Sequence, residues 1–484
     1  MRIIIVGAGF TGFQLAKRLI AEKKDVVLID SDEETLQYAS DRLDCMVIQG
    51  EGNSIKTLKS AGIAHADALV VITESDEVNM ITCLLVEPLY PKLIKIARVR
   101  NYSYYENTQD SAGRGTLMVN PDVEAAEALV RAIEHGASGA VTEFGGSDFL
   151  LTRIAVENGS TFDGVAVSGI RQKTDLPCVI AFVEKEEKAF LPSGATVIQA
   201  GNVLGIVTQK AHVASFAALC GSETHVLKKI AIIGAGKIGL LVAERLLGTA
   251  NAAADSHDAD DSGDSRGSKR TLKNMVSSFF HSSGFFRREL TIIDKDRKRA
   301  EAAAERFPHA AVFRTDVTDE SFADEEGLKK FDLAVCSTHN HELNIVVSGY
   351  LKSIGVNKTV SLVSTGEFAN IARKTGSDVA IPLRETIVDT ILTHLRGRHI
   401  TGVHTVSAGE LEIIEYEVSE KSPVAGRALK EIAAPGKFLI LLIRAAGKTG
   451  FTVPTGNTVL ATGDRLVVIL LADAQSGWER GLFV

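Results

Sequence analysis

Two glycine-rich segments, GAGFTG and GAGKIG, carry the spacing in this sequence that is most typical of phosphate chemistry. Each has the order G-x-G-x-x-G after an apolar run and before a helical pattern. In such a turn the first glycine permits a tight bend, the second lets the backbone approach a pyrophosphate, and the third packs the helix against the sheet. Main-chain N–H groups and the helix dipole would then hold the phosphate. The candidate contacts are Gly7, Ala8, Gly9, Phe10, Thr11 and Gly12, and in the second segment Gly234, Gly236, Lys237, Ile238 and Gly239.

An acidic residue stands at the end of the next predicted strand after each glycine segment. Asp30 lies about twenty residues beyond the first segment. There its carboxylate could accept hydrogen bonds from both hydroxyls of a ribose, and it would repel a 2′-phosphate, which favours NAD over NADP. Asp294 takes the same place after the second segment. The alternative is a glycine turn that only packs an empty domain. The context favours binding at the first segment clearly and at the second only slightly.

Polar residues at the ends of the third and fourth predicted strands match between the two copies. Glu51 aligns with Asp316, and Thr73 with Thr338. These side chains could touch adenine and ribose, or they could cap the helices that follow. Capping is the favoured interpretation for both threonines. Glu51 is the better ligand candidate, because an acid followed by glycine and asparagine in a loop has no local helix to cap.

Two arginines, Arg98 and Arg100, lie near the fifth predicted strand in the segment IARVRN. An arginine at the carboxyl edge of a sheet could bind phosphate through two hydrogen bonds. It could equally be a solvated charge at the end of a strand, and both interpretations stay open. The aligned positions in SLVST are Val363 and Thr365. The loss of both cations predicts two sites of unequal selectivity.

Several other chemistries are disfavoured by the residues. The net charge of −8 and the lack of a basic stripe argue against nucleic-acid binding. Five scattered cysteines and the loop His339-Asn340-His341 lack the spacing of a metal site. No Walker motif occurs, and the one G-x-S-x-G match, residues 263–267, lies in low-complexity sequence rather than between a strand and a helix, so it is not a nucleophile elbow. No catalytic and no metal-binding residues are therefore predicted, and the chain is not expected to be an enzyme.

The elements that must position the glycine segments follow from hydrophobic patterning. Short β-branched runs alternate with helical patterns, which is typical of a parallel, doubly wound sheet. A further helix should begin at Asn120-Pro121-Asp122, because proline suits a first turn, and the second copy repeats its apolar stripe at Ile387–Leu395. Strands of the first copy are expected at 2–6, 25–30, 45–49, 68–72 and 93–99.

A tandem duplication organises the chain, since Gly7 matches Gly234, Asp30 matches Asp294, and LPSGATVIQAGN later parallels VPTGNTVLATGD. The second copy contains an insertion, and its low-complexity part, residues 252–270, is expected to be disordered. The fold class is α/β: two Rossmann-like doubly wound parallel-sheet domains, each followed by a small α+β domain. The predicted domains are 1–135, 136–225, 226–398 with a disordered insertion near 250–288, and 399–484.

The order of these motifs resembles the RCK, or KTN, family, which includes the regulatory subunits of bacterial Trk potassium-uptake systems. The resemblance runs through GAGFTG, LID, QGEGNS, VITESDEVNM, IARVRN and the P-x-G-x-T blocks, over essentially the whole chain. It implies a cytosolic homotetrameric gating ring beneath a TrkH-like membrane potassium transporter subunit, with binding of NAD(H) and ATP or ADP. The family more often has aspartate where Glu51 stands, and the insertion is atypical.

The resemblance also implies where the chain works and what it contacts. The dinucleotide contacts carried over are Gly7, Gly9, Gly12, Asp30, Glu51, Gly234, Gly236, Gly239 and Asp294. The N-terminus has no signal-peptide pattern and no apolar run is long enough to cross a bilayer. A cytoplasmic protein, peripheral on the inner face of the membrane through its partner, is expected.

Two other functions fit the fold and lack the residues they need. An NAD-dependent dehydrogenase requires a general acid or base at the nicotinamide end, and neither small domain shows such a constellation. A repressor that senses NADH requires a basic helix-turn-helix, and none is visible. A nucleotide-controlled regulatory subunit is therefore the expected function, with the dehydrogenase as the alternative.

Overall fold

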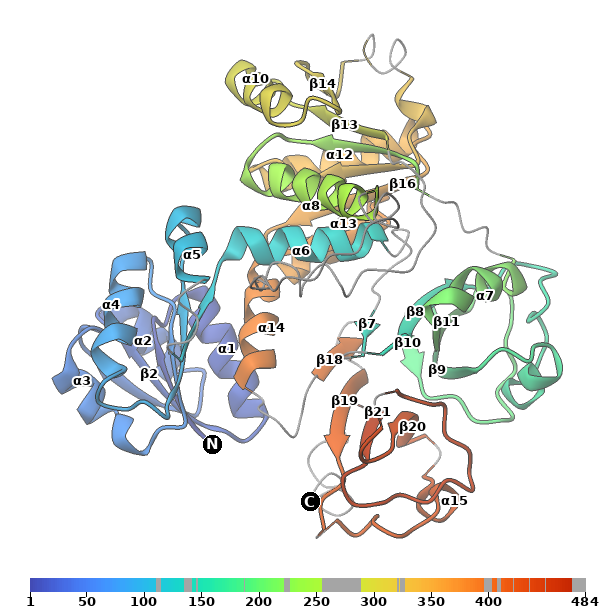
Figure 1. Ribbon diagram of the computed structural model, residues 1–484, viewed down its shortest axis with the longest axis horizontal. Helices are drawn as coiled ribbons and strands as arrows, with labels where there is room; N and C mark the ends of the chain where they lie inside the picture. Colours follow the sequence, from blue (N-terminus) through green and yellow to red (C-terminus); the bar gives the residue numbers. More distant parts are fainter. Residues whose placement is uncertain are drawn as a thin grey trace, which may run out of the picture. The chain divides into compact units, whose positions relative to one another are not determined.

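The chain forms two compact units, seen in the computed structural model (Figure 1). The first unit consists of Met1–Val130, Lys229–Asp255 and Arg288–Leu395, and therefore contains both glycine segments. The second consists of Arg131–Lys228, Ser256–Arg287 and Arg396–Val484. The structure describes residues 1–109, 115–134, 142–144, 147–186, 188–221, 227–254, 289–319, 322, 327–395, 403–406, 411–420, 422–434, 436–448 and 450–471.

The first copy of the duplicated domain is built on a six-stranded parallel sheet in the order β3-β2-β1-β4-β5-β6. The five predicted strands are all present, and the fold class is confirmed. Strand β6 is an additional edge strand of four residues, too short to show a period of its own. The elements are β1 (Arg2–Val6), α1 (Phe10–Ala21), β2 (Asp25–Asp30), α2 (Glu33–Ser40), β3 (Met46–Gln49), α3 (Ile55–Ser60), β4 (Ala68–Val71), α4 (Asp76–Val86), β5 (Ile94–Arg98), α5 (Tyr102–Gln109) and β6 (Thr116–Val119).

The second copy repeats this sheet in the order β14-β13-β12-β15-β16-β17. Helix α8 reaches Ala254, so the prediction of disorder is wrong for residues 252–254, where three alanines continue the helix. Residues 255–288 of the predicted insertion lie outside the described residues. The elements are β12 (Lys229–Ile233), α8 (Lys237–Ala254), β13 (Glu289–Ile293), α10 (Arg297–Arg306), β14 (Ala311–Phe313), β15 (Leu333–Cys336), α12 (His341–Ser353), β16 (Lys358–Val363), α13 (Gly366–Lys374) and β17 (Val379–Pro382).

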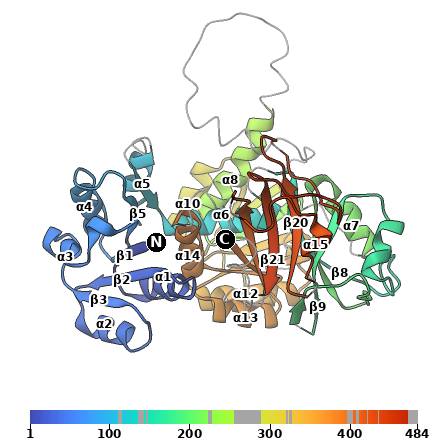
Figure 2. The same cartoon turned by 90° about the horizontal axis from the view of Figure 1, so that it is seen from below.

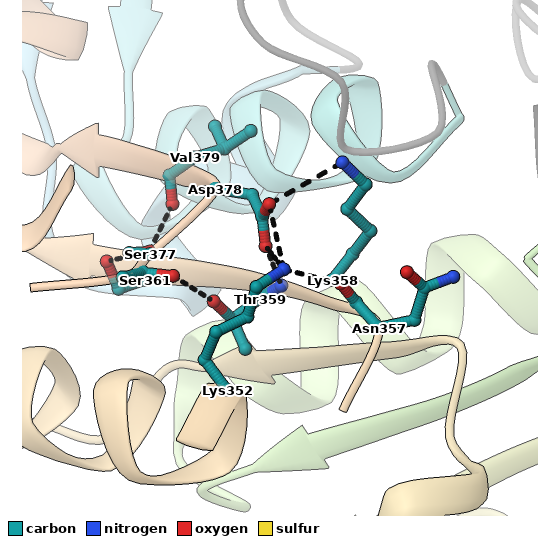
Figure 3. A network of polar contacts seen from close by, with 9 residues as sticks. Lys352, Asn357, Lys358, Thr359, Ser361, Ser377, Asp378 and Val379 are labelled. Carbon is teal, nitrogen blue, oxygen red and sulfur yellow. Dashed lines mark hydrogen bonds and ion pairs between the residues drawn. The ribbon is translucent and has the colours of Figure 1, made fainter. Parts of the chain in front are cut away.

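A polar network lies at the starts of β16 and β17, at the end of the second sheet opposite its glycine loop (Figure 3). Asp378 accepts hydrogen bonds from Lys352 Nζ at 2.9 Å and from Thr359 N at 2.8 Å, just before β17. The hydroxyls of Ser361 and Ser377 lie 2.9 Å apart in the buried layer behind it. Because these buried polar groups satisfy one another, they set the pairing of β16 with β17.

Two long helices connect the copies: α6 (Pro121–Glu134) follows β6, and α14 (Leu383–Leu395) follows β17. The Asn120 side chain accepts from the backbone N–H of Asp122 and Val123, both at 3.0 Å, so the predicted helix start is confirmed. Helix α14 lies beside α1 (Figures 1 and 2). Its buried residues pack into the core of the first sheet, and these are Ile387, Val388, Ile391, Leu392 and Leu395.

This packing joins the two copies into one body. Each fully buried aliphatic side chain of α14 contributes about 1.5–3 kcal/mol of apolar burial. Polar contacts frame the same junction: Arg18 of α1 pairs with Asp389, and Thr390 Oγ1 donates to Glu124 of α6 at 2.9 Å. The first sheet therefore obtains part of its core from a helix that is distant in the sequence.

The second unit contains two antiparallel sheets, in the orders β10-β9-β11-β8-β7 and β18-β19-β21-β20. They share one apolar core, in which Phe182 and Leu151 of one sheet join Ile413 and Leu442 of the other. The predicted small α+β domains are confirmed as a class, while their boundaries stay a prediction. The elements are β7 (Thr142–Glu143), β8 (Phe149–Ala155), β9 (Cys178–Lys185), β10 (Lys188–Phe190), β11 (Val203–Gln209), α7 (Val213–Leu219), β18 (Val403–Val406), β19 (Leu411–Glu417), α15 (Leu429–Ile432), β20 (Phe438–Arg444) and β21 (Arg465–Leu471).

The duplication is visible in the turns of the second unit. Thr196 Oγ1 accepts from Ser193 N at 3.0 Å, and Thr458 Oγ1 accepts from Thr455 N at 2.9 Å. Among the helices of the described residues, none combines the length and apolar character that a membrane span needs.

The close packing of α1 at Gly12 predicts different effects on stability for two glycine substitutions. A Cβ at Gly12 would lie 1.8 Å from the Gly7 carbonyl oxygen, whereas a Cβ at Gly9 would meet nothing within 4 Å. Gly12→Ala should lower the free energy of unfolding by about 1–3 kcal/mol, because the clash with backbone outweighs the helix propensity gained. Gly9→Ala should leave it nearly unchanged. Denaturant unfolding of the intact chain measures both, and equal effects would contradict the close packing.

Candidate functional site

The first glycine loop has the geometry that its spacing predicts. Gly7 has φ +104°, a left-handed conformation that disfavours side chains, and it turns the chain directly from β1 toward α1. Gly12 touches the Gly7 carbonyl oxygen and so brings α1 close to the sheet. Gly9 precedes the first turn of the helix and borders open space. The free N–H groups of that turn therefore face a space that a phosphate could enter.

Asp30 lies beside this loop at the end of β2. Its Oδ2 accepts from Ala8 N at 2.6 Å, and its Oδ1 accepts from Asp32 N at 3.0 Å. A carboxylate oxygen has two lone pairs, so each oxygen retains capacity for a further donor. Asp30 thus holds the glycine loop in place and keeps acceptors for a ligand hydroxyl.

A cleft of about 430 Å³ opens between the glycine loop and α2. Its size is within the range of roughly 300–1,000 Å³ for small-molecule pockets. The rings of Phe13 and Tyr38 lie 5.3 Å apart in a tilted arrangement, and Arg42 lies 3.9 Å from the centre of the Tyr38 ring. The lining residues are Ala8, Gly9, Phe10, Phe13, Gln14, Asp32, Glu34, Thr35 and Tyr38.

Most of these lining residues were not predicted from the sequence. Phe13 and Tyr38 come from different helices and meet only when α1 packs beside α2, so no spacing marks them. One signal was available in the sequence, because Asp32 followed by Glu33 and Glu34 is typical of a helix start. Asp32 caps α2, and the hydrogen bond from the Thr35 hydroxyl is the largest cause that lowers the pKa of its carboxyl.

The expected capping role of Thr73 and Thr338 is wrong. Ser75 caps α4 by accepting from Val78 N at 3.2 Å, and Asn340 caps α12 in the second copy. The reason is that each threonine lies two residues before the residue that caps the helix. A buried asparagine in that helix holds the threonine instead.

Asn79 is that asparagine in the first copy, and it is fully buried. Its Oδ1 accepts from Thr73 N and Thr73 Oγ1 at 2.9 and 2.7 Å. Its Nδ2 donates to the carbonyl oxygens of Thr73 and Arg98 at 3.1 and 2.8 Å. Asn344 holds Thr338 and Leu362 in the same way. These asparagines fix the ends of the fourth and fifth strands beside each glycine loop.

Arg98 and Arg100 have different environments at the end of β5. The Arg98 guanidinium donates to the Thr73 carbonyl oxygen at 2.6 Å. Burial, followed by the charge of Arg100, lowers the pKa of Arg98 to about 10. Arg100 is exposed, and its backbone N–H donates to the Asp76 carboxylate. One cation is therefore fixed at the strand end and the other extends toward solvent.

Strand pairing corrects the alignment of the two copies at these arginines. Val71 pairs with Ala97 in the first sheet, and Cys336 pairs with Ser361 in the second. Arg98 follows Ala97 in the first copy, and Leu362 follows Ser361 in the second. Leu362, and not Val363, is therefore the counterpart of Arg98.

The predicted counterparts Val363 and Thr365 are therefore wrong by one position, and Ser364 takes the place of Arg100. A shift of one residue moves a side chain to the other face of a strand, and the weakly similar sequences around β16 do not fix that register. The loss of both cations from the second copy remains.

Glu51 and Asp316 are placed differently. Glu51 is exposed and caps no helix, because Ser54 caps α3. Its neighbour Gly52 lies against the end of β1, where a Cβ would be 2.2 Å from Val6. Asp316 closes a local turn by accepting from Thr318 N and Thr318 Oγ1 at 3.1 and 2.8 Å. Those two hydrogen bonds, the backbone one first, lower the pKa of its carboxyl.

The second glycine loop repeats the first with a more enclosed acid. Gly234 has φ +107°, and a Cβ at Gly239 would lie 2.0 Å from its carbonyl oxygen. Asp294 accepts from Ala235 N and Asp296 N, both at 2.8 Å. It is 8% exposed, so less of its carboxylate is open to a ligand than at Asp30, which is half-buried. Gly236 borders open space, and Lys237 and Ile238 begin α8.

The loop His339-Asn340-His341 has a structural role at the start of α12, where Asn340 Oδ1 accepts from Leu343 N at 2.8 Å. Burial is the main cause that lowers the pKa of His341. In the part of the chain that the structure describes, no three histidine, cysteine or acidic residues gather as metal ligands would.

A doubly wound sheet with a glycine loop, an acid at the second strand end and an accompanying antiparallel sheet all occur twice, so the chain is a tandem duplication of a Rossmann-like domain with a small second domain. The TrkA-N domain family matches residues 3–120 and 277–382, and the TrkA-C domain family matches 151–221 and 413–475. These matches cover more than half of the chain. The chain belongs to the TrkA (RCK) family, whose members are regulatory proteins of potassium uptake and not enzymes, so the dehydrogenase alternative is rejected.

Relatives align along nearly their full length. The "Trk system potassium uptake protein TrkA" of Azorhizobium caulinodans is 28% identical over 98% of this chain and 96% of its own. The protein of the same name from Haemophilus influenzae is 25% identical over 97% and 96%. The GsuK channel bound to NAD has the same fold with a TM-score of 0.52 at 18% identity, covering 99% of this chain and 78% of its own.

The buried asparagine generates a stability prediction. Asn79→Ala would leave the Thr73 N–H and the Arg98 carbonyl without their partner, and each such buried group costs about 1–3 kcal/mol. We expect a loss of about 2–5 kcal/mol in the free energy of unfolding. Asn370→Ala, on the exposed face of α13, should change it by less than about 0.5 kcal/mol. Similar losses in the two variants would show that Asn79 does not hold the strand ends.

Proposed function

We propose that this chain is the nucleotide-controlled regulatory subunit of a Trk potassium-uptake system. It binds NAD(H) and the adenine nucleotides ATP and ADP, and it controls a TrkH-like membrane potassium transporter through the shape of a ring of four copies. It works in the cytoplasm, held at the inner face of the membrane by that transporter.

The observation that carries this proposal is the arrangement at the first glycine loop. Free N–H groups of α1, the Asp30 carboxylate and a cleft of about 430 Å³ lie together at one edge of the sheet. The relatives named as Trk potassium uptake proteins and the NAD-bound GsuK channel support the choice of ligand and partner. A nucleotide can shift such a ring only by its difference in affinity for the two shapes.

The proposed contacts divide between the copies. In the first, the glycine loop and Arg98 and Arg100 take phosphates, Asp30 takes a ribose, and Glu51 and Thr73 lie near the base or the second ribose. In the second copy, the loop from Gly234 to Gly239 with Asp294, Asp316 and Thr338 forms a weaker site, since Asp294 is more enclosed and both arginines are lost.

The test uses Asp30→Asn with Asp25→Asn as its matched control. Asparagine can still accept from Ala8 N, but its amide nitrogen cannot accept from Asp32 N. It also loses the charge that strengthens hydrogen bonds to ribose hydroxyls. We expect NADH affinity to fall about tenfold or more. Asp25 lies at the opposite end of β2 with a side chain 60% exposed, so Asp25→Asn should bind NADH normally. Calorimetry on the intact chain measures both affinities.

The same variants, reconstituted with the transporter in vesicles, test control of potassium flux. The NADH concentration that gives a half-maximal change in flux should rise with Asp30→Asn by the factor found in calorimetry, because binding and ring shape are linked. Flux that does not respond to NADH, ATP or ADP in the complex with the unmodified chain would contradict the proposal.

A further inference from the structure

The start of α14 is fixed beside the first glycine loop, although it belongs to the second copy. Val388 and Ile391 are fully buried in the core of the first sheet, next to Leu15 and Leu19 of α1. The pair Arg18–Asp389 adds a polar contact between the two helices. Because α1 begins at the glycine loop, this packing also fixes the first turn of α14 relative to that loop.

Arg384 lies on that first turn and reaches the loop. Its guanidinium carbon is 4.6 Å from the centre of the Phe10 ring, and Phe10 is the residue directly after Gly9. Arg384 is exposed. Among the described residues no carboxylate pairs with it within 4.0 Å. An arginine stacked on a ring keeps the N–H groups of its edge free, and these match two oxygens of a phosphate.

The equivalent position in the first copy carries the opposite charge. Arg98 pairs with Val119 at the end of the first sheet, and Leu362 pairs with Ile381 in the second. Val119 and Ile381 are followed three residues later by Asp122 and Arg384.

Each long helix therefore presents its first turn to the glycine loop of the other copy, with an acid in one case and a cation in the other. Asp122 is close enough to Lys237, the residue after Gly236, for the lysine charge to lower the pKa of its carboxyl, although burial raises that pKa more. At the second loop, Lys237 thus lies near the acid Asp122. At the first loop, Arg384 adds a positive charge. A phosphate-rich ligand is favoured at the first loop.

We propose that Arg384 is a phosphate-binding residue of the first nucleotide site, contributed by the second copy of the duplicated domain. This proposal rests on the proposed nucleotide-binding function and names a residue outside the glycine motif. It makes the first site a composite of both copies, selective for nucleotides that place several phosphate oxygens at the start of α1, such as ATP and ADP.

The experiment compares ATP with adenosine in the intact chain. The second loop is blocked by Gly236→Val, because a side chain there enters open space and fills the phosphate position without touching protein. In that background, Arg384→Met keeps the apolar stem against Phe10 and removes the guanidinium. Calorimetry should show ATP affinity reduced about tenfold or more. Adenosine affinity should change less than about twofold, since adenosine carries no phosphate.

Two further variants separate charge from packing. Arg384→Lys keeps the charge without the two-pronged edge and should give an intermediate loss of ATP affinity. Arg373→Met removes an exposed arginine in the last turn of α13, before the start of β17, whereas Arg384 follows the end of that strand, so this variant should bind ATP normally. Thermal unfolding checks each variant, and Arg384→Gln replaces the methionine variant if that variant is unstable.

The outcomes distinguish the two claims. If the Gly236→Val chain binds ATP and Arg384→Met binds it equally well, or if ATP and adenosine lose affinity alike, Arg384 is not a phosphate ligand. If neither that chain nor the unmodified chain binds ATP or NADH, the proposed function itself fails. A loss that appears only when the second loop is open would assign Arg384 to the second site and overturn the proposal.

Discussion

The contact between Gly12 and the Gly7 carbonyl oxygen is the constraint on which the first site depends. Only a residue without a side chain allows α1 to approach the end of β1 this closely. That approach places the free N–H groups of α1 at the junction of β1 and β4, where the strand order of the parallel sheet reverses. Asp30 and Asn79 then fix the loop and the adjacent strand ends. The second loop repeats the contact with Gly239 and Gly234.

Helix α14 of the second copy packs into the core of the first sheet and so joins the two Rossmann-like domains. Because α14 supplies core residues to the first sheet, a ligand that shifts the start of α1 also acts on a helix of the second copy. The two copies differ at two positions near the glycine loops. Arg98 of the first copy corresponds to Leu362 of the second, and Asp122 corresponds to Arg384. In the proposed function, the packed helices between the two candidate sites allow a ligand at one site to change the affinity for a ligand at the other.

The sequence predicts those features of the fold that depend on interactions between residues close together in the chain. Strand positions, the left-handed Gly7, the helix start at Asn120 and the buried stripe of α14 all follow from periodicity or from a single residue's conformational limits. Thr73 was misjudged as a cap because the competing partner, Asn79, is six residues away and buried. The sequences around β5 and β16 are too dissimilar to fix the alignment of Arg98 with the second copy, and only the strand pairing identifies Leu362 as its counterpart. Contacts such as Phe13 with Tyr38 and Arg384 with Phe10 join separate helices, and no sequence pattern contains them.

In the proposed function, the first glycine loop is the principal nucleotide site of a regulator. An experimentally determined structure of the intact chain with ADP tests it most directly. We expect phosphates on the N–H groups at the start of α1, a ribose hydroxyl on Asp30, and higher occupancy at the first loop than at the second. A chain with ADP bound elsewhere, or bound equally at both loops, would contradict it.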